Sequence, residues 1–150
     1  MSKIDDLDLK LIKELQYDGR KSFREIAEKL DVAEGTVYNR ITKLKEQGII
    51  RNFIVDIDYS RLGYDLTVVI GVKAKGGHLQ EIEKKIAQEE NITAVYDVTG
   101  EYDAIVVAKF PDRDALNKLV KKLNGIEDVD RTYTMLVLNV VKEQHGIDLE

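Results

Sequence analysis

Apolar side chains in the first fifty residues recur at the spacing of amphipathic helices. Residues 7–15 place Leu7, Leu11, Ile12 and Leu15 on one helical face, and Asp5 is positioned to cap the N-terminus. A second helix is predicted from about Ser22 to Leu30 and a third from about Glu34 to Gln47, before Gly48. The spacing of apolar positions fits a helix-turn-helix, at Ala27, Val32, Val37 and Ile41. A small helical bundle that binds nothing is the alternative.

After Gly48 the apolar period changes. Residues 50–57 alternate as a strand does, and residues 58–64 are expected to connect two domains. The remainder follows the order βαββαβ, with strands at 66–75, 92–99, 104–110 and 129–142 and helices at 78–90 and 112–124. This order is typical of the ferredoxin-like fold, with both helices on one face of an antiparallel sheet. We therefore predict an α+β protein: a three-helix helix-turn-helix domain at 1–50, a β-strand and connecting segment at 51–64, and a ferredoxin-like domain at 65–150.

Both faces of the predicted sheet are apolar. In the last predicted strand, Leu136, Leu138 and Val140 point to one side, whereas Met135, Val137 and Val141 point to the other. Two helices can cover only one face of such a sheet. The other face is therefore expected to meet another subunit, so we predict at least a dimer.

Charge and composition narrow the class of protein. The net charge is −5, but residues 36–51 carry a local balance of +3, from Arg40, Lys43, Lys45 and Arg51 against Glu46. A basic region on an acidic chain is compatible with a DNA reader. The chain has no cysteine, which excludes disulfides and thiol chemistry. The start, Met1 to Asp6, does not resemble a signal peptide, and no apolar stretch is long enough to span a membrane, so a cytoplasmic location is expected.

The third predicted helix offers a polar face to a nucleic acid. Opposite its apolar side lie Gly35, Asn39 and Thr42, flanked by Tyr38 and Lys43. Asn pairs with adenine edges in the major groove, Thr meets a thymine methyl group, and Tyr and Lys suit phosphates or bases. Arg24 and Arg51 are candidate phosphate contacts. The alternative is a solvated helix face with ordinary surface charges.

Several segments, in order along nearly the whole chain, resemble the Lrp/AsnC (feast/famine) family of transcription regulators. They are 4–12 (IDDLDLKLI), 25–30 (EIAEKL), 36–44 (TVYNRITKL), 48–50 (GII), 62–64 (LGY), 98–103 (VTGEYD) and 131–134 (RTYT). Two positions depart from the family pattern. Ala33 stands where Ser or Thr usually caps the recognition helix, and Asp31 stands where Gly is common in the turn.

The resemblance implies dimers, often assembled into octamers of four dimers, and an amino-acid-type effector bound between dimers. The full set of predicted DNA-contacting residues is Arg24, Gly35, Thr36, Tyr38, Asn39, Arg40, Thr42, Lys43 and Arg51. Carried over by position from the family, the effector site falls on Thr99, Gly100, Tyr102 and Asp103, with Tyr133, Thr134 and Leu136 nearby. The turn can offer backbone N–H groups to a carboxylate and Asp103 can meet an ammonium group, although a purely structural turn is the alternative.

We predict a sequence-specific, double-stranded-DNA-binding transcription regulator that responds to an amino acid or related metabolite. It is expected to be no enzyme, with no cofactor. His78 and His145 are far apart and lack partners at ligand spacing, so no metal site is predicted. One alternative is an effector-insensitive architectural DNA-binding protein of the same fold. The other is a small ferredoxin-like acyl-phosphate hydrolase, which leaves the helical third unexplained.

Overall fold

The structure, a computed structural model, describes residues 4–144 and 146–149. The expectations about the first three residues and about His145 lie outside the described residues. The chain divides into two compact units, residues 1–56 with 142–150 and residues 57–141. The C-terminal residues therefore group with the helices and not with the predicted 65–150 domain. Lys13 contacts them at the surface: its Nζ lies 2.7 Å from Asp148 Oδ1 and donates to the Leu149 carbonyl.

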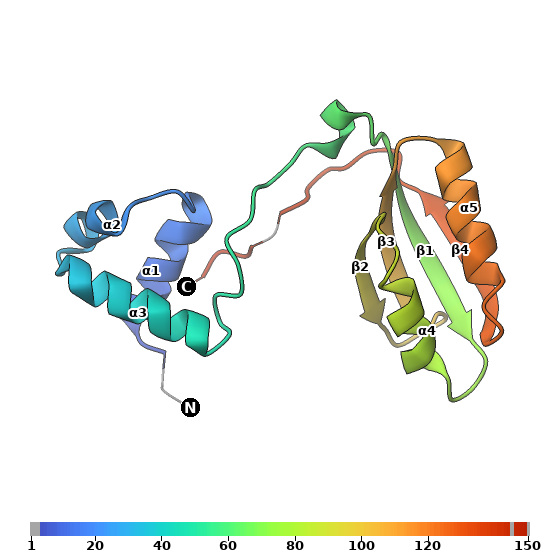
Figure 1. The fold of residues 1–150 in the computed structure, drawn as a ribbon, viewed down its shortest axis with the longest axis horizontal. Helices are drawn as coiled ribbons and strands as arrows, with labels where there is room; N and C mark the ends of the chain where they lie inside the picture. The colour runs from blue at the N-terminus through green and yellow to red at the C-terminus, as the bar shows by residue number, and fades with distance from the viewer. Residues whose placement is uncertain (1–3, 145, 150) are drawn as a thin grey trace. The chain divides into compact units, whose positions relative to one another are not determined.

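Three helices form the first unit: α1 (Asp6–Tyr17), α2 (Phe23–Leu30) and α3 (Glu34–Glu46) (Figure 1). They match the three predicted helices. Their core contains the apolar positions that the helical spacing selected, Leu11, Leu15, Ile26, Ala27, Val37 and Ile41. Ala27 lies on the buried side of α2, where its small side chain permits close approach of a neighbouring helix.

The helix starts differ in how they are capped. Asp5 forms a capping box with Asp8 at α1, and Ser22 forms one with Glu25 at α2. The N-cap residue of α3 is Ala33, which has no side chain able to accept a hydrogen bond from the first turn. In the turn before it, Asp31 adopts a left-handed conformation with φ of 54°. Both departures from the family pattern therefore lie at positions whose backbone geometry favours other residues: an N-cap at Ala33, which favours Ser or Thr, and a left-handed turn at Asp31, which favours Gly.

The strand predicted at 50–57 is wrong for the single chain. No regular secondary structure is assigned to residues 51–58, and their side chains are exposed. The apolar alternation is present, but no described strand pairs with this segment. A strand forms only where its backbone can make hydrogen bonds with a neighbouring strand. A short 3-10 helix, η1 (Tyr59–Leu62), follows.

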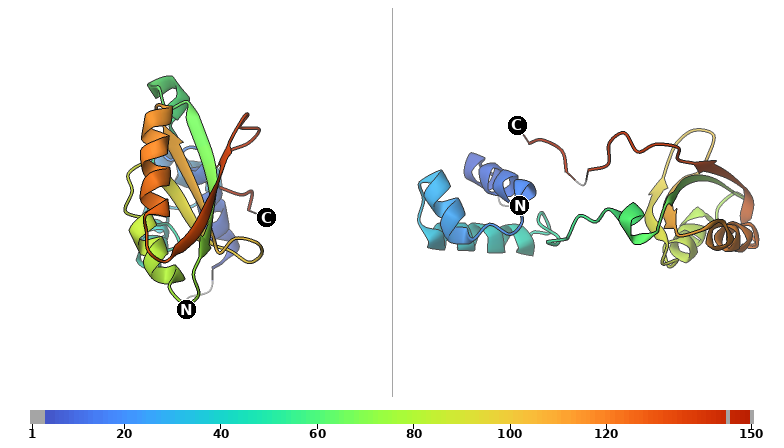
Figure 2. Two further views of the ribbon diagram at one scale, coloured as in Figure 1. Left: turned by 90° about the vertical axis from the view of Figure 1, so that its right-hand side faces the viewer. Right: turned by 90° about the horizontal axis from the view of Figure 1, so that it is seen from above.

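The second unit contains four strands and two helices in the predicted order: β1 (Leu66–Ala74), α4 (Leu79–Ile86), β2 (Ile92–Asp97), β3 (Ala104–Phe110), α5 (Arg113–Asn124) and β4 (Val129–Leu136). The antiparallel sheet has the order β2-β3-β1-β4. Both helices lie on one face of it (Figure 2). The α+β fold, with its helix-turn-helix and ferredoxin-like parts, is therefore confirmed.

Strand registers define two faces of the sheet. The face under α4 and α5 is buried and includes Val68, Ile70, Val72, Val106 and Phe110. The opposite face carries the alternate positions, among them Val69, Ile105, Val107, Tyr133 and Met135, paired in register across β1, β3 and β4. No described element of residues 57–141 packs over this opposite face as the helices do over the first (Figure 2).

The last strand is shorter than predicted. Strand β4 ends at Leu136, and only Val137 adds one further hydrogen bond, from its N–H to the Thr67 carbonyl. The partner strand β1 begins at Leu66, which the register places opposite residue 138, so residues 139–142 have no β1 residue opposite them. Helix α4 is also shorter than the predicted 78–90.

Among the described residues no helix combines the length and hydrophobicity needed to cross a membrane.

Candidate functional site

Helix α3 presents part of the predicted DNA-contacting set to solvent. Gly35, Tyr38, Asn39 and Lys43 are exposed, whereas Thr36 and Thr42 are half-buried. The inward side of the helix holds Val37, Ile41 and Leu44, so burial fixes the rotation of α3 about its axis. The structure therefore brings Asn39 and Lys43, four residues apart, onto one accessible face.

Helix α2 supports this face. The Tyr38 ring packs edge-on against Phe23, with ring centroids 6.1 Å apart, so its orientation is restrained although more than half of the side chain is exposed. Arg24 is exposed, and its Nε lies 3.0 Å from Glu28 Oε1 one turn later. That surface pair is weak, so Arg24 remains available to an external anion.

Arg40 lies differently from the other predicted DNA contacts. Its guanidinium hydrogen-bonds Asp5 and, at 3.0 Å, the Oδ1 of Asp8. Asp8 is buried, and Arg40 is only partly exposed. The hydrogen bond from Arg40 is also the main reason that the pKa of Asp5 lies below its ordinary value. The pairing joins the start of α1 to the middle of α3.

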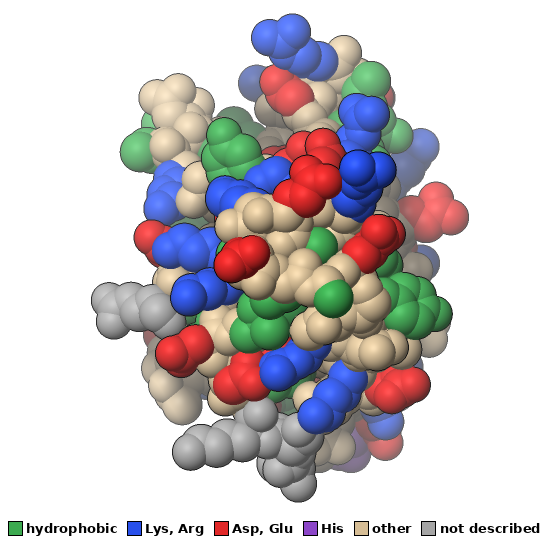
Figure 3. Space-filling view, turned by 90° about the vertical axis from the view of Figure 1, so that its left-hand side faces the viewer, with side chains coloured by type: hydrophobic (Ala, Val, Ile, Leu, Met, Phe, Trp, Pro, Cys, Tyr) green, Lys and Arg blue, Asp and Glu red, His purple; other side chains and the backbone are tan. Residues whose placement is uncertain are grey.

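Because two carboxylates neutralise Arg40, the basic character of this region rests on Lys43, Lys45 and Arg51, all exposed. On the face of the molecule shown in Figure 3, Lys and Arg side chains alternate with Asp and Glu and do not gather into one large basic area. Phosphate contact would therefore depend on a few separate cations. Lys45 was not in the predicted set, although its position in the last turn of α3 was visible in the sequence.

The second group of predicted residues surrounds the turn between β2 and β3. Tyr102 and Tyr133 stack, with ring centroids 6.2 Å apart and an interplanar angle of 23°. The Tyr102 ring covers Gly71, where an added Cβ would lie 2.7 Å from ring carbons. Gly71 is therefore part of this site, and a glycine in the middle of an apolar strand is the signal that could have identified it.

Asp103 is already engaged by its own domain. Its Oδ2 accepts from the Ala74 N–H at 2.9 Å and its Oδ1 from Lys73 Nζ at 3.1 Å. These contacts, the backbone bond first, hold the pKa of Asp103 below its ordinary value. Its backbone also pairs with Val72 and Val98. Asp103 thus fixes the end of the hairpin against β1.

The remaining predicted effector residues divide between the two sheet faces. Tyr133 pairs in register with Gly71, on the uncovered face, whereas Thr134 and Leu136 pair with Ile70 and Val68 on the helix-facing side. Thr99 and Gly100 are exposed in the turn, and Gly100 has φ of 122°. The structure therefore gathers Gly71, Tyr102 and Tyr133, but not Thr134 and Leu136, into one candidate site.

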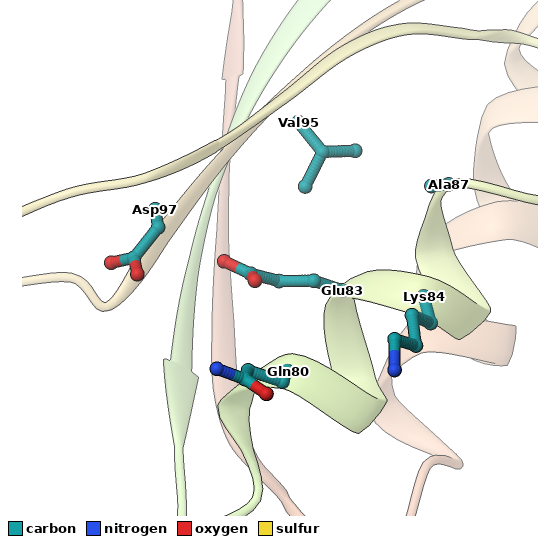
Figure 4. Close-up of a pocket in the computed structure, with 6 residues that line it drawn as sticks. All are labelled: Gln80, Glu83, Lys84, Ala87, Val95 and Asp97. Carbon is teal, nitrogen blue, oxygen red and sulfur yellow. The ribbon is translucent and has the colours of Figure 1, made fainter.

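A separate shallow pocket lies between α4 and β2, with a volume of about 320 Å³ (Figure 4). Glu83 extends across it toward Asp97, and Gln80 lies beside it. Burial, and then the charge of Asp97, raises the pKa of Glu83. The Oε1 atom of Glu83 is buried without a hydrogen-bond partner among the described residues. Apart from these two acids, the pocket lining has no arrangement of side chains that indicates catalysis.

A helix-turn-helix with an exposed polar recognition face, joined to a ferredoxin-like domain, defines the class: a DNA-binding transcription regulator. Residues 4–45 match the AsnC-type helix-turn-helix domain, and residues 67–147 match the Lrp/AsnC ligand binding domain. The chain belongs to the Lrp/AsnC family.

Similar proteins agree with this assignment. An uncharacterised HTH-type transcriptional regulator from Pyrococcus furiosus is 49% identical over 97% of this chain and 99% of its own length. The HTH-type transcriptional regulator FL11 of the same organism is 37% identical, covering 93% of each chain. Among solved structures, AsnC of E. coli has a TM-score of 0.90 at 28% identity, covering 98% of this chain and 99% of that one. These relatives are transcriptional regulators, so the hydrolase alternative is dropped and the chain is not an enzyme.

Proposed function

We propose that this regulator reads a specific DNA sequence with α3 and changes its assembly in response to an amino acid or related metabolite. The observation that carries the first part is the exposure of Asn39 and Lys43 on one face of α3, above a buried apolar side. We assign base reading to Asn39, with Gly35, Thr36, Tyr38 and Thr42 around it. Phosphate contact falls to Lys43, Arg24 and Arg51, and Arg40 acts as a positioning residue for α3.

A salt titration tests DNA binding. A fluorescent duplex selected from a randomised pool is titrated with the full chain at several salt concentrations. Lys43→Ala is expected to reduce the salt slope by about 1 and to weaken all duplexes similarly. Lys118→Ala is the matched control, because Lys118 is exposed on α5 in the other unit. Equal slopes for wild type and Lys43→Ala would move the phosphate contact away from α3.

We propose that the uncovered sheet face mediates self-association. Apolar side chains at Val69, Ile105, Val107 and Met135 lie there with Tyr133, and the face has no cover within residues 57–141. Light scattering is expected to give a dimer or a multiple of it, up to the octamer of four dimers that the family resemblance implies. A mass of 17.1 kDa, that of one chain, at micromolar concentration would contradict the proposal. A cytoplasmic location accords with a DNA partner and forms part of the same proposal.

We place the effector on the same face. The tyrosine pair and the turn at Thr99 and Gly100 can receive a small molecule, with backbone N–H groups of the turn available to a carboxylate. Asp103 is assigned as the positioning residue of that turn. The match to a ligand binding domain over residues 67–147 supports an effector of some kind. A regulator of the same fold from Neisseria meningitidis was solved as a complex with L-Met, which makes L-Met a first probe.

Calorimetric titration with L-Met and the other amino acids tests this placement. Tyr133→Ala is expected to weaken binding of the best ligand, as is Gly71→Ala, because its Cβ displaces the Tyr102 ring. Thr134→Ala is the control, since Thr134 faces the helix side. If Thr134→Ala loses binding while Tyr133→Ala keeps it, the site lies on the other face. If the wild type binds no amino acid, the effector-insensitive architectural alternative is favoured.

A further inference from the structure

Two loops at one end of the sheet bring three potential metal ligands together. His78 precedes α4 as its N-cap residue and Glu81 follows in the first turn, so both project from the same side of that turn. Asp128 comes from far along the chain, directly before β4. The ligand atoms of all three side chains lie within 4.8 Å of one another. Sequence spacing could not show this cluster, because it depends on the pairing of β1 with β4.

The backbone between the two loops is fixed. The Lys75 N–H donates to the Asp128 carbonyl at 2.8 Å, and Lys75 Nζ donates to the Glu127 carbonyl at 2.9 Å. These bonds tie the chain after β1 to the chain before β4. The Lys75 ammonium group is thereby directed to a backbone oxygen, and no ion pair joins it to a carboxylate of the cluster among the described residues.

The three side chains are free to accept a ligand. His78 makes no capping hydrogen bond, and within the described part of the chain none of the three has a hydrogen bond or ion pair. His78 and Glu81 are exposed, and Asp128 is half-buried. A divalent cation bound between Glu81 and Asp128 would be attracted by the charge of both carboxylates.

We propose that His78, Glu81 and Asp128 form a binding site for a divalent transition-metal ion such as Zn²⁺. One imidazole nitrogen with two carboxylate oxygens suits the borderline ions at the upper end of the affinity order, and not Mg²⁺ or Ca²⁺, which take oxygen ligands. Metal–ligand distances of about 2.0–2.2 Å place tetrahedral ligand atoms roughly 3.3 Å apart. Rotation of the exposed side chains can bring the ligand atoms from their present spacing, within 4.8 Å, to this distance. Water molecules would complete the coordination shell of the ion.

A bound ion would clamp the start of α4 to the loop between α5 and β4. This role is separate from DNA reading and from the tyrosine pair, because it involves neither α3 nor the uncovered face. Metal binding at this cluster can therefore be tested independently of DNA reading and effector binding.

The test uses the full chain without an affinity tag, stripped of metal and titrated calorimetrically with ZnCl2 and NiCl2. We expect one ion per chain, and at least about tenfold weaker binding in His78→Ala, Glu81→Gln and Asp128→Asn. Two variants serve as controls and should bind as wild type does. His145→Ala removes the other histidine of the sequence, and Glu90→Gln removes an exposed acidic charge shortly after α4. Circular dichroism confirms that each variant is folded.

Other results would overturn the proposal. No calorimetric binding below about 100 µM metal would show that the cluster is an ordinary acidic surface. Loss of binding in His145→Ala but not in His78→Ala would place the ion elsewhere. Ca²⁺ binding as tight as Zn²⁺ binding would show that the imidazole does not select the ion. The visible spectrum of the Co²⁺-loaded protein gives a second readout, because it should change in His78→Ala if the imidazole is a ligand.

Discussion

The uncapped start of the recognition helix leads to a specific prediction: Ala33→Ser should stabilise the helical unit. Ala33 has φ of −70° and ψ of 143°, almost the conformation of Ser22 at φ of −68° and ψ of 151°. Ser22 Oγ accepts from the Glu25 N–H at 3.2 Å. A serine at position 33 can therefore accept from the Thr36 N–H without strain.

The expected gain follows from what the cap adds. A side-chain cap stabilises a helix by about 0.5–2 kcal/mol. Here the Thr36 N–H already donates to the Ala33 carbonyl at 2.9 Å, so the donor is not bare. Residue 36 is also Thr and not Glu, so no reciprocal capping box forms. We expect the lower half of the range, about 0.5–1 kcal/mol, or a few degrees in Tm.

Urea unfolding followed by circular dichroism at fixed protein concentration measures the gain, with an unchanged m-value. Hydrogen exchange at the Thr36 amide should slow in parallel. Ser22→Ala is the matched control and should lose about 1 kcal/mol, because it removes the cap that α2 has. If Ser22→Ala destabilises the unit but Ala33→Ser leaves both stability and exchange unchanged, the described backbone at Ala33 is wrong.

Two further predictions concern carboxyl groups of the sheet unit. Glu83→Gln should raise Tm at pH 7 by a few degrees, because it removes a partly buried charge whose pKa is raised by desolvation and by Asp97. A raised folded-state pKa costs stability at high pH, so this advantage should shrink as the pH falls toward 4.5; equal Tm values at pH 7 would contradict it. Asp103→Ala should lower stability in urea unfolding, since it removes the acceptor of the Ala74 N–H, whereas Asp103→Asn keeps an acceptor and should lower stability less. Because the pKa of Asp103 is lowered in the folded state, its contribution is complete above the ordinary value of 3.8 and is lost as the pH falls through the folded-state pKa. A stability loss in Asp103→Ala that does not shrink as the pH is lowered below 3.8 would contradict this.

Local pattern was sufficient for most of the fold. The inward faces of the three N-terminal helices depend on residues three and four apart, so Val37 and Ile41 could be placed in the core from spacing alone. The second helix of the sheet unit was also predicted from local spacing, at 112–124, and Asp112 is the N-cap residue of α5. The βαββαβ order followed from alternating periods along the chain.

Features that depend on a distant partner could not be predicted. The segment 50–57 has the alternation of a strand but no partner strand within the described chain, and β4 ends at Leu136, opposite Val68 near the start of β1. Periodicity does not report the presence of a partner.

The candidate sites show the same limit. Arg40 looked like any exposed basic residue of a recognition helix, because nothing local indicates that Asp5 and Asp8 of α1 reach it. Asp103 looked like a turn acceptor free to bind a ligand, and its pairing with Lys73 across the sheet was invisible in the sequence. Exposure on a helix face can be read from spacing, but an ion pair between elements requires the fold.

The most direct test of sequence reading by α3 is the affinity ratio between the selected duplex and a scrambled duplex, measured by anisotropy at one salt concentration. Asn39→Ala is compared with wild type and with Gln47→Ala, a control at the exposed end of the same helix. The account predicts that Asn39→Ala loses about 1–3 kcal/mol on the selected duplex, with little change on the scrambled one, while Gln47→Ala keeps the wild-type ratio. An unchanged ratio in folded Asn39→Ala protein would contradict base reading by Asn39.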